Sequence, residues 1–351
     1  MKTHKNLYSQ VCSFDNLLLA ARKAAKGKRS KPSTARFLFE LEREIPRLQR
    51  ELLDQTYQPG GYTRFTVRDT KPRVISAAPF RDRVVHHALC NVIEPIFDKT
   101  FIHDSYACRR GKGTHAAVDR YQAFCRKNRY VLKGDIVRYF PSMDHEILMA
   151  AVAKRIACER TLGLIRKVLG SMRSEDGLYF SGDDLFTPFE RPHGIPIGNL
   201  TSQFFANVHL TGFDHWVKET LERRFYVRYV DDFVIFGDDK PALWDALAAC
   251  RERLGAIRLR LHPRKSRVYR VSDGIDFLGY RVFPTHRLLR KSNVRHARRR
   301  LRKLQAGYRE GTITLDDVRQ SVMSWIAHAS HADAYRVRGR VLRDAVFAGK
   351  G

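Results

Sequence analysis

Two adjacent carboxylates, Asp231 and Asp232, lie between two apolar runs and offer the clearest chemistry in this chain. The flanking runs, residues 225–230 and 233–237, are rich in β-branched and aromatic residues, which predicts two strands. Because only the Asp pair can turn the chain, we expect a hairpin with both charges at its tip. Like charges this close repel each other, and a cation is the simplest way to offset them. An ordinary acidic turn on a surface hairpin is the alternative interpretation.

A third carboxylate, Asp135, ends a predicted strand that begins at Tyr130. A charge at the end of a buried strand is costly unless it is paired or bound to a metal. If this strand lies beside the hairpin, three carboxylates meet with no His or Cys nearby in sequence, a donor set that suits Mg²⁺. Two such ions about 4 Å apart serve nucleotidyl transfer: one activates a 3′-hydroxyl, and the other holds the triphosphate and the leaving pyrophosphate.

Two basic stretches precede the carboxylates. Lys71 and Arg73 alternate with β-type residues, and a guanidinium fixed on a strand suits a phosphate, although a solvated edge strand is the alternative. Residues 106–115 form a Gly-rich basic loop before a helix predicted to begin near Thr114, an arrangement that suits an anion. Arg109 and Lys112 are the nucleic-acid contacts that we expect from this loop. Its register differs from that of a Walker A loop.

A third basic stretch lies near the C-terminus. Between Arg287 and Lys303 there are nine Lys or Arg and no Asp or Glu, while Val294 and Leu301 belong to an apolar stripe at helical spacing. This pattern predicts a helix with one packed face and one cationic face, suited to a nucleic-acid backbone. A plain solvated face is the alternative. The expected contacts are Arg290, Lys291, Arg295, Arg298, Arg299 and Arg302.

The overall charge points to a polyanionic partner. The chain has 65 Lys and Arg against 37 Asp and Glu, a formal net charge of +28, and nucleic acid is the usual partner of so basic a protein. An anionic membrane surface competes with this interpretation, but no basic amphipathic anchor stands apart from the rest. At 351 residues, the chain can bury a sizeable core in two or three subdomains.

The sequence also bears on the compartment. No run of 18 apolar residues occurs, and residues 1–6 lack the apolar core of a signal peptide, so we expect no membrane span. The six cysteines include no C-x-x-C pair, which argues against a zinc site. Scattered single cysteines fit a reducing environment, and we therefore expect a cytoplasmic protein.

Residues 229–232 (Y-V-D-D) resemble the YxDD motif of reverse transcriptases, and about residues 55–290 follow the motif order of that family. The resemblance implies an α+β right-hand polymerase fold, with fingers, an antiparallel palm sheet covered by helices, and a C-terminal helical thumb. The implied divisions are an N-terminal helical extension (1–58), fingers (59–134, with part of 160–195 interleaved), the palm with its catalytic hairpin (135–285) and a basic thumb (286–351).

The same resemblance implies roles for individual residues. Asp135, Asp231 and Asp232 become the catalytic residues and, together with Ile136, the ligands of two Mg²⁺ ions for which Mn²⁺ is an expected substitute. Phe140 becomes the aromatic residue that blocks the ribose 2′-hydroxyl. The expected nucleotide-binding residues are Lys71, Arg73, Phe140, Ile197, Gly198, Gln203 and Lys265. Residues 277–280 resemble the primer grip.

One departure narrows the resemblance. Residues 197–203 read I-G-x-x-x-S-Q, where most reverse transcriptases have Q-G-x-x-x-S-P. This form resembles the enzymes of diversity-generating retroelements, as do residues 87–91, 113–116 and 284–286. Such enzymes use dNTPs to copy a template-repeat RNA into cDNA with errors at template adenines, and they work with a small basic pentameric accessory protein. A retron, group II intron-like or phage-defence reverse transcriptase, or a non-catalytic RNA-binding scaffold, is the alternative.

Overall fold

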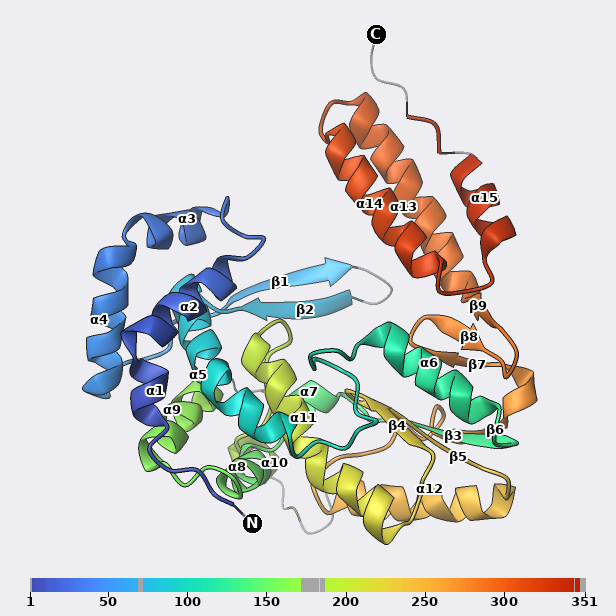
Figure 1. Cartoon of the computed structure of the whole chain (residues 1–351), viewed down its shortest axis with the longest axis horizontal. Coiled ribbons are helices and arrows are strands. Elements are labelled where there is room, and N and C mark those ends of the chain that lie inside the picture. The colour runs from blue at the N-terminus through green and yellow to red at the C-terminus, as the bar shows by residue number, and fades with distance from the viewer. Residues whose placement is uncertain (1, 69–71, 172–182, 184–186, 344, 348–351) are drawn as a thin grey trace.

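A computed structural model of the chain describes residues 2–68, 72–171, 183, 187–343 and 345–347 (Figure 1). Lys71 lies outside the described residues. So does much of the polar stretch 171–193, for which the sequence predicts a loop or a β-flap.

Four helices form the N-terminal end of the structure, as predicted for residues 1–58. They are α1 (Tyr8–Cys12), α2 (Phe14–Ala25), α3 (Pro32–Phe39) and α4 (Leu41–Leu53). The Ser13 side chain caps α2 by accepting a hydrogen bond from the Asn16 amide. Helix α2 buries Leu17 and its alanines against the long helix α5 (Phe80–Asp98). A two-stranded antiparallel ribbon, β1 (Thr63–Arg68) and β2 (Pro72–Ala77), precedes α5.

The central sheet has four antiparallel strands in the order β4-β5-β3-β6. Its strands are β3 (Tyr130–Asp135), β4 (Tyr226–Tyr229), β5 (Asp232–Gly237) and β6 (Arg267–Arg270). Helix α6 (Thr114–Cys125) contacts one face, and α12 (Lys240–Gly255) lies along the other (Figure 1). Sequence patterning predicted the first three strands but not β6, in which two exposed arginines flank Val268 and Tyr269.

Alternate side chains of this sheet enter two separate hydrophobic clusters, as the period of two in a strand requires. One cluster, on the side of α11 (Leu200–His215) and α12, contains Leu132, Tyr226, Phe233 and Ile235. The other, on the side of α6, contains Val131, Val227, Val234 and Phe236. Both faces of the sheet are therefore buried, and only its ends remain for chemistry.

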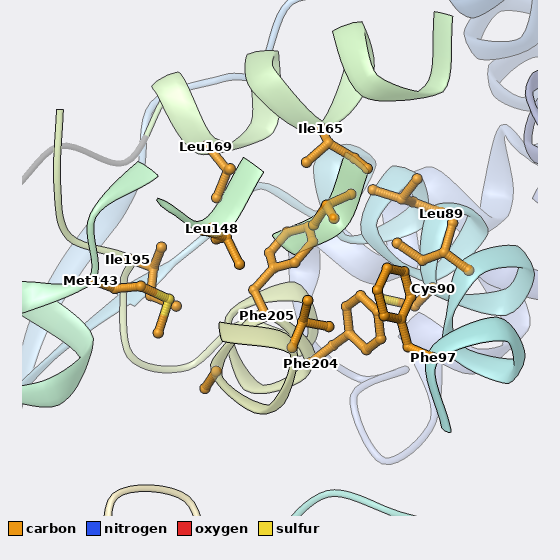
Figure 2. Packing of buried hydrophobic residues seen from close by; sticks show 14 of the residues in the cluster. Leu89, Cys90, Phe97, Met143, Leu148, Ile165, Leu169, Ile195, Phe204 and Phe205 are labelled. Carbon is orange, nitrogen blue, oxygen red and sulfur yellow. The ribbon is translucent and has the colours of Figure 1, made fainter. Parts of the chain in front are cut away.

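The first cluster continues into a set of helices beside the sheet. They are α7 (Tyr139–Ser142), α8 (His145–Ala153), α9 (Glu159–Gly170), α10 (Thr187–Glu190), α11 (Leu200–His215) and the π-helix η1 (Trp216–Thr220). The sequence predicts a helix that begins near Asp144, a good N-cap residue, and Asp144 caps α8: its carboxylate accepts from the amides of Glu146 and Ile147. Figure 2 shows Phe204 and Phe205 of α11 among residues of α5, α8 and α9. The centre of this core is α11.

The C-terminal part begins with a three-stranded sheet: β7 (Ile275–Phe277), β8 (Tyr280–Val282) and β9 (Arg287–Leu289), preceded by the short 3-10 helix η2 (Val271–Asp273). Helices α13 (Lys291–Arg309), α14 (Leu315–Ala329) and α15 (Tyr335–Arg343) follow, and Figure 1 shows them as a separate bundle. The sequence predicts Thr314 and Asp317 as a capping pair, and they form the capping box of α14. Tyr280 joins sheet and bundle by donating a hydrogen bond to the His328 carbonyl, 2.8 Å away. Among the described residues, every helix is too short or too polar to span a bilayer.

One buried histidine on α11 makes stability depend on pH. Burial lowers the pKa of His209 to about 4, and within the described part of the chain neither ring nitrogen has a hydrogen-bond partner. A histidine in the unfolded chain titrates near 6.5. Below that pH the unfolded state binds more protons than the folded state, so the free energy of unfolding falls until the folded pKa is reached.

We expect His209→Gln to reduce the fall in unfolding free energy between about pH 6.5 and about pH 4 by up to about 1 kcal/mol per pH unit. Urea unfolding followed by circular dichroism at several pH values in this window measures the slope. His103→Gln is the control, because the His103 side chain is 74% exposed. An unchanged slope in His209→Gln contradicts the assignment.

Candidate active site

The hairpin predicted from residues 225–237 is present. Strands β4 and β5 pair so that Tyr229 lies opposite Asp232, and the two-residue turn between them is Val230-Asp231. The sequence-based prediction of Asp231-Asp232 as the turn was therefore wrong by one residue, because Asp232 already belongs to β5. Val230 adopts the left-handed region at φ 56°, which is rare for a β-branched residue.

The sheet brings the third carboxylate to the same place. Strand β3 pairs with β5 so that Asp135 lies directly opposite Asp232. One residue earlier, Gly134 lies opposite Phe233, and a Cβ at Gly134 would lie 2.2 Å from the Phe233 ring. Glycine is therefore required at this position for the ring to cross β3. The three predicted catalytic residues meet at one end of the central sheet.

The carboxylates affect one another electrostatically. Burial raises the pKa of Asp231 to about 6, helped by the negative charges of Asp232 and Asp135 and opposed by Arg73. Burial also raises the pKa of Asp232, and Lys133 is the strongest of the cations that oppose this rise. Both shifts report negative charges held together in a place poor in water.

Lys265 already contacts this cluster. Its Nζ lies 3.0 Å from Oδ2 of Asp135, whose side chain is 20% exposed. The backbone holds the two residues near each other, because the His262 amide donates to the Asp135 carbonyl at 2.8 Å and the Ser266 hydroxyl accepts from the Asp135 amide. The sequence predicts Lys265 as a nucleotide-binding residue, near the leaving pyrophosphate by its resemblance to the family; in the structure it is the counterion of Asp135.

The carboxylates only partly fit the expected metal site. Within the described ranges, no three His, Cys, Asp or Glu side chains are grouped so as to hold a metal ion. The donors are nevertheless of the type that Mg²⁺ prefers, and their raised pKa values reflect a repulsion that a cation would relieve. Ile136, the fourth expected ligand, is buried beside Asp135 and bridges to Leu261. Lys265 therefore competes with a metal ion for Oδ2 of Asp135, whereas the other carboxylate oxygen is not engaged by this ammonium.

The predicted nucleotide-binding loop packs against the ribbon strand β2. The Ser76 amide donates to the Ile197 carbonyl at 3.1 Å, and the Asn199 side chain donates to the Ser76 carbonyl. Gly198 lies at φ 119°, and a Cβ there would lie 2.8 Å from Ile75. Arg73 of the same strand is close enough to Asp231 for its charge to lower that pKa. The strand thus brings loop 197–199 and Arg73 toward the carboxylates.

Phe140 and Gln203, the other predicted nucleotide contacts, occupy defined positions near this loop. Phe140 is half-buried on α7, and its carbonyl accepts from the Ile195 amide at 2.9 Å. Gln203 is exposed in the first turn of α11, where its side-chain carbonyl accepts from the Cys108 thiol.

Arg109, a predicted nucleic-acid contact, also has partners within the protein. Its Nε lies 2.6 Å from Asp98, its Nη1 donates to the carbonyls of Ile102 and Ser105, and the guanidinium lies over the Phe101 ring. These contacts direct its donors inward, and its RNA contact stays a prediction. Lys112 is exposed, and its ammonium donates to the His103 carbonyl.

The predicted cations of the C-terminal bundle lie mostly on the outside of α13. Arg290, just before the helix, pairs with Asp276 at 2.9 Å. The remaining five are exposed: Lys291, Arg295, Arg298, Arg299 and Arg302. The opposite stripe packs through Ala297 and Leu301. The amphipathic pattern read from the sequence is therefore present, and its RNA contact remains a prediction.

Sequence reasoning missed an ion pair between Arg228, on the hairpin strand β4, and Asp214 on α11. Their closest atoms are 2.7 Å apart, and both side chains are fully buried. An arginine inside an otherwise apolar strand was the available signal, because a charge there requires a partner.

Comparison with known proteins decides the family. The family described as reverse transcriptase (RNA-dependent DNA polymerase) matches residues 66–282, more than half of the chain, and this range contains all three carboxylates. The chain belongs to the reverse transcriptase family. Its members are RNA-directed DNA polymerases, so the prediction of an enzyme of this type is confirmed.

Relatives of this reverse transcriptase include intron-encoded proteins. Protein YkfC of Escherichia coli K12 is 28% identical over 288 residues, which cover 71% of this chain and 72% of YkfC. Group II intron-encoded protein LtrA of Lactococcus lactis is 25% identical over 179 residues, half of this chain but only 28% of LtrA. The chain therefore matches less than a third of LtrA.

A solved structure supports the fold. Apo telomerase from Candida tropicalis superimposes with a TM-score of 0.50 at 11% sequence identity, covering 81% of this chain and 59% of that one. The shared mixture of helices and sheet is consistent with the predicted right-hand polymerase fold of a reverse transcriptase.

We expect Asp135→Asn and Asp231→Asn each to reduce primer extension by roughly a thousandfold, because each removes a charge from the reacting centre. RNA binding, measured by filter retention, should change little. Asp239→Asn is the matched control, since Asp239 is exposed before α12. Full polymerase activity in either active-site variant would refute the catalytic assignment.

Phe140→Ala is expected to let the enzyme accept ribonucleotides, because a smaller side chain opens space beside the sugar. The measurement is kcat/KM for a dNTP divided by that for the matching rNTP, and we expect this ratio to fall by at least about tenfold. Phe39→Ala is the control, because Phe39 is 91% exposed on α3. An unchanged ratio assigns Phe140 to packing alone.

Proposed function

We propose that this reverse transcriptase belongs to a diversity-generating retroelement and copies a template-repeat RNA into cDNA with errors at template adenines. The I-G-x-x-x-S-Q sequence of residues 197–203 carries the proposal. Its first two residues lie in the loop that packs on β2, the strand that bears Arg73. An apolar Ile197 beside the nascent base pair offers no side-chain hydrogen bond with which to discriminate between nucleotides.

For catalysis we propose that Asp135, Asp231 and Asp232, with the Ile136 carbonyl, hold two Mg²⁺ ions, or Mn²⁺ in their place. When bound, such ions lower the pKa of a 3′-hydroxyl and neutralise the triphosphate. Arg73, and Lys71 beside it in sequence, would pair with the outer phosphates. Lys265 would exchange its contact with Asp135 for one with the pyrophosphate, because both partners are anions within reach of a flexible ammonium.

The remaining parts of the chain are assigned by charge. We propose that Lys112 and the outer face of α13 bind the backbone of template RNA and cDNA, since the net charge of +28 favours polyanions. The α13–α15 bundle then serves as the thumb and the β1–β2 ribbon as part of the fingers. A small basic pentameric accessory protein and a cytoplasmic location complete the proposal.

A group II intron-like reverse transcriptase is the second candidate. The match with LtrA, an intron-encoded protein, favours it. The two candidates differ in template and in fidelity, which one experiment can separate.

The test is primer extension with Mg²⁺ and dNTPs on a template-repeat RNA, with and without the accessory protein, followed by sequencing of the cDNA. We expect misincorporation at template adenines to exceed that at other bases by at least about tenfold, equivalent to about 1.4 kcal/mol of lost discrimination. Ile197→Gln should reduce this excess, and Leu19→Gln, on an exposed part of α2, should not. Synthesis with uniformly low error favours the intron-like candidate.

A further inference from the structure

Arg228 lies on β4, within the hairpin itself, and its side chain is 0% exposed. Its Nε and Nη2 each donate to Asp214 at 2.7 Å, and the Tyr226 hydroxyl donates to the same carboxylate. Removing two charges from water costs about as much as their attraction returns, so such a pair is weak evidence for a role in stability. The contact made by the third guanidinium nitrogen of Arg228 indicates a role other than stability.

That nitrogen, Nη1, donates to the Val230 carbonyl at 3.1 Å. Val230 is the residue held at φ 56°, and it immediately precedes Asp231. A β-branched side chain disfavours this left-handed conformation, which persists only where the surroundings enforce it. The hydrogen bond from Arg228 acts on the strained residue itself.

The anchor behind Arg228 is rigid. Nη1 also donates to the Asn207 side chain at 3.1 Å, and Asn207 in turn donates to the Ala107 carbonyl. Asn207 and Asp214 both lie on α11, the central helix of the core. On its other side, the backbone of Arg228 exchanges hydrogen bonds with Asp104 and Tyr106. The Arg228 guanidinium therefore connects the turn to α11, while hydrogen bonds to the backbone of Asp104 and Tyr106 hold Arg228 itself in place.

We propose that Arg228 is a positioning residue for DNA synthesis: from its buried site against Asp214, it holds the left-handed Val230 turn so that Asp231 faces Asp135 and Asp232. Without the guanidinium, Val230 relaxes toward negative φ and carries Asp231 away from the other two carboxylates. The inference rests on polymerase activity but not on the retroelement assignment.

The test uses Arg228→Lys, which keeps a positive charge near Asp214 but lacks the planar group that contacts Asp214 and Val230 together. On a homopolymer RNA with a DNA primer, we expect kcat to fall about 10- to 100-fold, the usual effect of a small misplacement at a reacting centre. KM for the dNTP and the affinity for primer-template should stay within about threefold. Thermal unfolding confirms that the variant is folded.

Rescue separates positioning from general support of the fold. Glycine adopts positive φ without steric cost, so in a Val230→Gly background Arg228→Lys should lower kcat by less than about threefold relative to Val230→Gly alone. Arg270→Lys, on the exposed edge of β6, is the control and should leave kcat unchanged in both backgrounds. An undiminished kcat in Arg228→Lys overturns the proposal, as does an equal loss in both backgrounds.

If Arg228→Lys does not fold, Asp214→Glu provides the same comparison, because it keeps the charge pair and displaces the guanidinium from Val230. Rescue of Asp214→Glu by Val230→Gly supports the proposal, and absence of rescue overturns it. The homopolymer template also keeps the two functions distinct. An inactive wild-type enzyme would contradict the polymerase function. An active wild-type enzyme that copies faithfully would contradict only the retroelement assignment.

Discussion

The register between β3 and β5 is the constraint on which the site depends. A slip of one residue would move Asp135 off Asp232 and turn Leu132 and Val131 toward the wrong hydrophobic clusters. The Phe233 ring, packed where Gly134 has no side chain, fits only one register. The buried faces of the sheet therefore fix the position of two carboxylates, although neither carboxylate contributes to that burial.

The helix α11 connects the other parts of the site to this sheet. It follows loop 197–199, which packs on β2, and the Tyr139 hydroxyl donates to the Ala206 carbonyl from the helix that bears Phe140. Farther along α11, the side chains of Asn207 and Asp214 bind the guanidinium of Arg228 on the hairpin strand β4. The helix that bears Phe140, loop 197–199 and the hairpin are thus all connected to α11. A substitution in the core around α11 is therefore expected to affect all three.

The sequence predicted what local pattern determines. Apolar runs rich in β-branched and aromatic residues located β3 and the hairpin, and capping residues located the starts of α8 and α14. It failed where contacts between segments, near or far in sequence, decide the outcome. The inward contacts of Arg109 depend on Asp98 and on carbonyls of its own loop, β6 becomes a strand by pairing with β3, and the position of the turn depends on how β4 pairs with β5.

The outer face of α13 has a consequence for the bundle itself. Neighbouring arginines such as Arg295, Arg298 and Arg302 stand three or four residues apart along the helix, where like charges repel and weaken it. A bound phosphate backbone, or a concentrated salt solution, removes that repulsion. A bound polyanion would therefore stabilise α13 by offsetting the repulsion between its arginines.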